Sequence, residues 1–101
     1  MADNTMMYPT EEEARTRIEK EREFQADKWG MQMHDNGTWS MILGEEVGEM
    51  SEACLREIQG NGLTPGMLEH QIDEAVQIAA VATAWAARLI MKRNHFNQEL
   101  E

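Results

Sequence analysis

Four glutamates crowd the segment EEVGEMSE at residues 45–52, and their spacing is the first feature of the chain that could support chemistry. Glutamates three or four residues apart lie on one side of a helix and repel one another, so they add no helical stability. Either this surface is simply solvated, or a cation lies between the carboxylates. A hard divalent cation such as Mg²⁺ prefers oxygen ligands and would cancel the repulsion.

The helical wheel divides these glutamates into two pairs. At about 100° per residue, Glu46 and Glu49 lie on the shoulder of the apolar stripe, whereas Glu45 and Glu52 lie on the far side. Partial burial of two adjacent carboxylates is unfavourable unless a cation or hydrogen-bond donors compensate. The alternative is that both side chains bend outwards into water.

A second acidic position lies in the apolar segment near the C-terminus. Glu74 is the one acid within the central part of this segment, and Gln77 follows three residues later on the same helix face. Two helices packed side by side can form a metal site from facing side chains. Here they would bring together four oxygen-bearing side chains: Glu46, Glu49, Glu74 and Gln77.

Three helices must position these residues, because no segment alternates convincingly as a strand would. The predicted helices run from about Glu11 to Asp27, from the residue after Thr38 to about Gln59, and from Pro65 to about Arg93. Thr10 and Glu13 match a capping box at the first helix. Thr64 precedes a proline and is the predicted N-cap of the third helix.

The apolar surfaces of these helices are narrow. The first helix carries a thin stripe and is expected on the outside of the bundle: Ala14, Ile18 and Phe24. The second carries a longer stripe: Leu43, Val47, Met50, Cys54 and Ile58. Ala75–Ala87 is apolar almost all the way round, and three helices of one chain cannot easily bury it. The sequence therefore predicts an all-α helical bundle that oligomerisation completes.

The segment KWGMQMHDNGTW at residues 28–39 breaks the helical period with two glycines and a D-N-G turn signal. It is predicted to be a loop that begins with Lys28 and carries Trp29, His34 and Trp39. Two compatible interpretations follow. The loop folds down over the core, or it forms a pocket wall that offers aromatic stacking surface and a hydrogen-bonding imidazole.

Composition bounds the class of protein. The formal charge of −10, from 19 acidic and 9 basic residues, argues against electrostatic binding to DNA, RNA or an anionic membrane. The lone cysteine, Cys54, places the protein in a reducing cytoplasm. The longest uncharged stretch, Ala75–Ala87, is too short to span a bilayer. The length predicts one domain over residues 1–101. Its ends, residues 1–9 and 95–101, are expected to be frayed. The N-terminal residues do not have the composition of a signal peptide.

These residues resemble a known family. Residues 45–49 have the form EExxE, and 24 residues separate Glu49 from Glu74, which opens an ExxQ. This pattern is similar to that of the MazG-like all-α nucleoside triphosphate pyrophosphohydrolases, in which EExxE is followed by ExxD. The segments KWGMQMHDNGTW, ILGEEVGE and QIAAVATAW resemble the small single-domain bacterial and phage members. The resemblance covers about residues 20–90.

The resemblance implies the metal ligands. By the match, Glu46, Glu49 and Glu74 bind Mg²⁺, or Mn²⁺ in its place, and Gln77 stands where the family has an aspartate. An amide oxygen can coordinate the ion or one of its waters but brings no charge. We therefore expect weaker metal binding or one fewer ion. Asp73 is a substitute ligand, although it lies about 100° from Glu74 around the helix.

The resemblance also implies an activity: hydrolysis of a (d)NTP to (d)NMP and pyrophosphate by a homodimer or tetramer, for nucleotide pool cleansing or adjustment. Glu45 either activates the attacking water or is a solvated surface acid, and the expected substrate-binding residues are Lys28, Trp29, His34 and Trp39. Arg88 and Lys92 lie on the Glu74 face but about 20 Å or more further along the helix. They are expected to be surface charges unless the end of this helix bends back or comes from a neighbouring chain. His70 is given no role. The alternatives are a phosphoribosyl-ATP pyrophosphatase-like enzyme, or a catalytically impaired helical protein that binds nucleotide or a partner.

Overall fold

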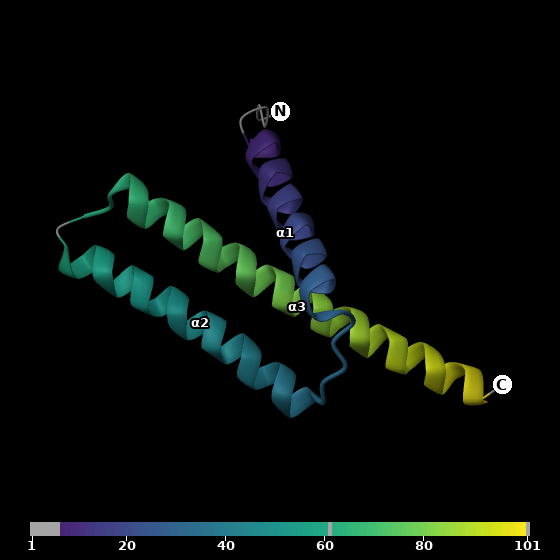
Figure 1. Cartoon of the computed structure of the whole chain (residues 1–101). Helices are drawn as coiled ribbons and strands as arrows, with labels where there is room; N and C mark the ends of the chain where they lie inside the picture. Colours follow the sequence, from purple (N-terminus) through teal and green to yellow (C-terminus); the bar gives the residue numbers. More distant parts are fainter. Residues whose placement is uncertain (1–6, 61, 101) are drawn as a thin grey trace, which may run out of the picture.

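The computed structural model describes residues 7–60 and 62–100, and these residues form three helices and no strand (Figure 1). The helices are α1 (Met7–Trp29), α2 (Asn36–Gln59) and α3 (Pro65–Leu100). The predicted all-α class is therefore confirmed for this part of the chain.

The longest helix, α3, organises the other two. Figure 1 shows α2 lying alongside α3 in the antiparallel direction, while α1 runs across α3. Both α1 and α2 pack against α3, whereas the backbones of α1 and α2 do not approach each other. The C-terminal part of α3 extends beyond both partners, so its side chains from residue 89 to 100 are exposed. Every site that joins distant parts of the chain is therefore built on α3.

The beginning of α2 differs from the prediction. The helix begins at Asn36, and the Oδ1 atom of Asp35 accepts a hydrogen bond of 2.7 Å from the Thr38 backbone N–H. The D-N-G sequence is thus an N-cap and a first turn rather than a loop turn, because Asp35 satisfies one of the free N–H groups there. The preceding helix, α1, ends at Trp29 and is followed by Gly30, whose φ of 70° suits a residue without a Cβ.

The other helix ends give a mixed result. The N-cap of α3 is confirmed, since Thr64 Oγ1 accepts a hydrogen bond of 3.1 Å from Met67 N–H. The predicted capping box at Thr10 is wrong, because α1 already begins at Met7; Pro9 is tolerated in the first turn, where its missing N–H would have no partner anyway. Residues 95–100 are helical rather than frayed. Residues 1–6 and 101, which share the same prediction, lie outside the described part.

The predicted apolar stripe of α2 is confirmed only in part, since Leu43, Met50 and Cys54 are partly buried. On α2, Val47 is 46% exposed and Ile58 is 76% exposed, whereas Trp39 and Ala53 are buried. On α3, the carboxylate-bearing face lies inwards with Glu74, while one side of the segment 75–87 is exposed. Val47 and Ile58 thus belong to an apolar surface of α2 that a single chain leaves exposed.

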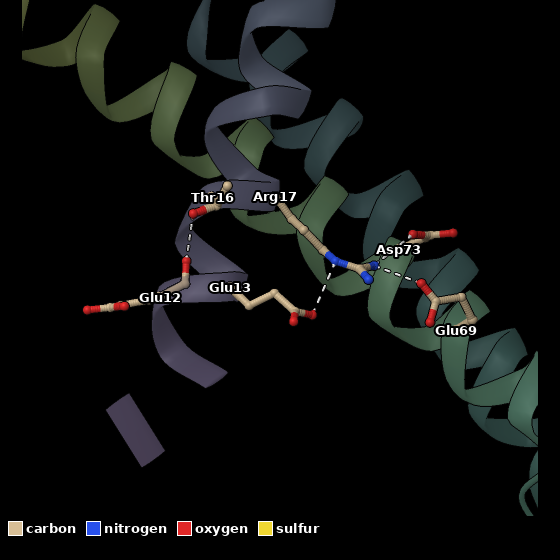
Figure 2. A network of polar contacts seen from close by, with 6 residues as sticks. All are labelled: Glu12, Glu13, Thr16, Arg17, Glu69 and Asp73. Carbon is tan, nitrogen blue, oxygen red and sulfur yellow. Dashed lines mark hydrogen bonds and ion pairs between the residues drawn. The ribbon is translucent and has the colours of Figure 1, made fainter. Parts of the chain in front are cut away.

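The contact of α1 with α3 is largely polar. Of its predicted stripe, only Ile18 is partly buried. Figure 2 shows Arg17 of α1 reaching α3, where its Nη1 lies 2.8 Å from Glu69 Oε1 and 3.8 Å from Asp73 Oδ1. The Nε of Arg17 also lies 3.6 Å from Glu13 Oε2 on its own helix. Exposed ion pairs of this kind contribute little free energy, so they orient α1 more than they stabilise it.

The helix α3 also bears on the membrane question. By length and composition alone it could cross a bilayer, because it contains an apolar 18-residue window with at most two charged side chains. This window is longer than Ala75–Ala87, the stretch that was judged too short from the sequence. Only 17% of its most apolar 18-residue window is buried within the chain. A single helix of this kind is weak evidence, since core helices of soluble proteins meet the same criteria.

The N-cap of α2 can be tested by substitution. We expect Asp35→Ala to lower the free energy of unfolding by about 1 kcal/mol, because the Thr38 N–H loses its acceptor. Asp35→Ser keeps a capping oxygen and should restore most of this loss. Urea denaturation measures both variants, and equal midpoints for Asp35→Ala and the unaltered chain would contradict the assignment.

Candidate metal centre

Three carboxylates from two helices converge at the α2–α3 interface. Glu46 and Glu49 lie one turn apart on α2, and Glu74 faces them from α3. One oxygen from each residue lies within 4.8 Å of the others. The antiparallel packing of the two helices produces this convergence, because it places the middle of α2 beside the first half of α3.

Burial distinguishes the three carboxylates. Glu74 is only 9% exposed, Glu46 is partly buried and Glu49 is exposed. The Oε2 atom of Glu74 is buried and has no hydrogen-bond partner among the described residues. An unpaired buried carboxylate oxygen carries a large desolvation penalty. Glu74 therefore lacks the compensation that a buried acid requires.

The electrostatics of the cluster favour uptake of positive charge. Burial raises the pKa of Glu74, and the neighbouring Glu49 carboxylate raises it further. Burial also raises the pKa of Glu46, with further contributions from Glu49 and Glu74. The nearby imidazole of His70, with Nε2 3.9 Å from Glu74 Oε1, opposes the shift of Glu74 when protonated. Either protons or a cation can relieve this repulsion.

The residues present fit a hard divalent cation. Mg²⁺ holds its ligand oxygens at about 2.1 Å, which places them about 3 to 4 Å apart around the ion. The separation within the cluster, up to 4.8 Å, is slightly larger, and exposed Glu49 is free to close it. The unpaired Oε2 of Glu74 supplies a buried lone pair that no protein donor uses. A set of three carboxylates suits hard cations such as Mg²⁺ or Mn²⁺ better than it suits softer metals, which prefer sulfur or nitrogen ligands.

The other predicted metal-site residues lie around this cluster. Gln77 is partly buried one turn after Glu74, and its amide makes no hydrogen bond within residues 7–60 and 62–100. Asp73 does not belong to the cluster; it is exposed and lies 3.8 Å from Arg17 Nη1, so it is a poor substitute ligand. Glu45 is exposed, yet close enough to raise the pKa of Glu46, whereas exposed Glu52 is not part of the cluster.

The predicted substrate-binding residues separate into two groups. Trp39 is 2% exposed within the first turn of α2, and the His34 ring packs edge-on against it at 4.9 Å. Trp39 is therefore a core residue with little open stacking surface. Trp29 is 54% exposed at the end of α1, with the Lys28 ammonium 4.7 Å above its ring. The structure thus does not gather all four side chains around one pocket.

Some residues near the carboxylate cluster were not predicted from the sequence. Glu21 of α1 is partly buried, raises the pKa of Glu46 and accepts a hydrogen bond of 3.0 Å from Gln25. His70 could have been found, because its i, i+4 spacing to Glu74 places both on one face of α3. Arg88, predicted to be a surface charge, is partly buried and lines a cleft with Trp39. No spacing rule predicts Glu21, since it depends on how α1 crosses α3.

Comparison with known proteins does not identify a relative. No family model, no curated protein and no solved structure matches the chain.

The raised pKa values predict a pH dependence of stability. The folded protein binds protons on Glu46 and Glu74 more tightly than the unfolded chain, whose glutamates titrate near 4.5. The metal-free protein should therefore lose stability as the pH rises from about 4.5 through the raised pKa values. The glutamine of the Glu74→Gln variant cannot ionise, so the stability of this variant should depend less on pH.

Urea denaturation in EDTA at constant ionic strength, repeated across this pH range, measures the effect. Glu52→Gln is the matched control, because it removes one exposed glutamate from the same chain and should keep the original slope. A slope for Glu74→Gln equal to that of the unaltered protein would contradict the cluster electrostatics.

Proposed function

We propose that this chain is a Mg²⁺-dependent nucleotide pyrophosphohydrolase that converts a (d)NTP to (d)NMP and pyrophosphate, as the resemblance to the MazG-like family implies. The supporting observation is the cluster of Glu46, Glu49 and Glu74, which comes from two helices and includes a buried oxygen without a partner. A cation held by this cluster would bridge the carboxylates of the protein and the phosphates of the substrate, both of which are negatively charged.

In this proposal the carboxylates act as ligands and a neighbouring acid handles the proton. Glu46, Glu49 and Glu74 hold the metal, which when bound neutralises charge on the departing pyrophosphate. Gln77 orients a ligand or a water through its amide oxygen without adding charge. Glu45 is exposed beside Glu46, where it can accept the proton of the attacking water. No side-chain nucleophile is required.

The base or sugar is proposed to lie near the end of α1. Trp29 offers an exposed indole for stacking, and Lys28 lies beside it as a cation for a phosphate. His34 is partly buried and its ring packs edge-on against Trp39, so it can offer a ring nitrogen to the substrate from a fixed position. We place the protein in the cytoplasm, where the lone Cys54 stays reduced and nucleotides are available.

We also propose a homodimer or tetramer. The single chain leaves large apolar side chains exposed on α2 and α3, among them Val47, Ile58, Leu68 and Leu89. Its buried apolar core, within the described residues, is small: Trp39, Ala53, Ala80 and Val81. Packing of a second copy on these surfaces would supply the missing burial.

Release of pyrophosphate across a panel of NTPs and dNTPs, with Mg²⁺ or Mn²⁺, tests the activity. We expect Glu49→Gln to lower the rate by more than about 100-fold, since it removes a ligand rather than a residue that supports one. Glu52→Gln should stay within about twofold, because that side chain faces water.

The outcomes separate the alternatives. No release with any nucleotide would contradict the hydrolase and favour the impaired nucleotide-binding protein. Phosphoribosyl-ATP is assayed beside the panel. Release of pyrophosphate from this compound and from no NTP or dNTP would favour a phosphoribosyl-ATP pyrophosphatase-like enzyme. Equal loss in Glu49→Gln and Glu52→Gln would show that the two faces of α2 were wrongly assigned.

A further inference from the structure

A positively charged cleft lies on this strongly acidic protein. The cleft has a volume of about 210 Å³ and is formed by α1, the segment after it, the start of α2 and the second half of α3. Its polar side chains are Arg22, Gln25, Gln32 and Arg88, and Trp39 also lines it. None of its lining residues in the described chain is acidic, so the cleft carries two positive charges in a chain of net charge −10.

The two arginines of the cleft have no carboxylate partner within residues 7–60 and 62–100. Arg22 makes no ion pair or side-chain hydrogen bond there, and Arg88 makes only a contact of 3.9 Å from Nη1 to Met33 Sδ. By contrast, Arg15 and Arg17 on α1 each pair with a glutamate. Both cleft arginines are partly buried, and each guanidinium carries five donors that seek acceptors. Their charge is therefore uncompensated where a ligand can reach it.

We propose that this cleft is an oxyanion-binding subsite in which Arg22 and Arg88 hold a phosphate group. The planar guanidinium matches a phosphate with two parallel hydrogen bonds, and two of them from different helices can hold one group from two sides. Gln32 adds neutral donors, while Gln25 is fixed by its bond to Glu21. The buried indole of Trp39 closes one side of the cleft and strengthens these interactions by excluding water.

The subsite is distinct from the carboxylate cluster. Arg88 follows Glu74 by fourteen residues, about 21 Å along α3, and Trp39 precedes Glu46 by two helical turns. The cluster repels anions without a metal, whereas the cleft attracts them, so the two sites can be studied separately. This separation is too long for one triphosphate chain to span, so the phosphate held in the cleft belongs to another molecule: a free anion such as pyrophosphate, or a second nucleotide.

Calorimetric titration of the metal-free protein in EDTA tests this subsite, with inorganic pyrophosphate and a nucleoside triphosphate as separate probes. We expect Arg22→Gln and Arg88→Gln each to weaken binding by about tenfold or more, the loss of a charge-assisted hydrogen bond. Arg15→Gln on α1 and Arg93→Gln on α3 remove the same charge outside the cleft and should leave the affinity within about twofold.

Arg88→Lys guards against misfolding, because it keeps the charge and should bind with intermediate affinity. Binding of pyrophosphate that depends on Arg22 and Arg88 would identify a free-anion site. Binding of only the triphosphate, with the same dependence, would identify a second nucleotide site. Absence of binding at millimolar concentration, or equal weakening in all four glutamine variants, would overturn the proposal. Because no metal is present, neither result depends on whether the chain hydrolyses nucleotides.

Discussion

Burial of the Glu74 carboxylate between α2 and α3 is the constraint on which the rest of the structure depends. Its Oε2 has no partner in the described chain, and two glutamates of α2 face it. For Glu46 and Glu74, repulsion at about 5 Å amounts to roughly 3 kcal/mol at an effective dielectric constant of about 20. A small protein has few kcal/mol of stability, so this arrangement is unfavourable unless protons or a cation compensate.

The small apolar core supplies little burial to offset the repulsion between the carboxylates. Among the described residues, the buried apolar side chains are only Trp39, Ala53, Ala80 and Val81, while Val47 and Ile58 remain open to solvent. The interface between α2 and α3 is therefore also the interface that carries the three glutamates of the cluster. Binding of a cation would stabilise the fold and form the candidate site in one event, because the ligands come from both helices.

Spacing rules account for part of this arrangement. The helical wheel predicted that Glu46, Glu49 and Glu74 could face one another, and the antiparallel packing of α2 on α3 in the structure brings them together. The wheel located the buried side of α2 only in part. Leu43, Met50 and Cys54 of the predicted stripe are partly buried, but Val47 and Ile58 are exposed, and the buried residues of this helix are Trp39 and Ala53. The pairing of Arg22 with Arg88 could not be predicted from the sequence, because the two residues line one cleft only through the crossing of α1 over α3.

The most direct measurement is the free energy of unfolding as a function of Mg²⁺ concentration near pH 7.5, at constant ionic strength. The account predicts that Mg²⁺ stabilises the unaltered protein, by about 2.7 kcal/mol when its concentration reaches 100 times the dissociation constant. Glu74→Gln should lose most of that gain, whereas Glu52→Gln should keep it. Equal gains in the unaltered protein and in Glu74→Gln, or no gain in either, would contradict the claim that the buried carboxylate holds a cation.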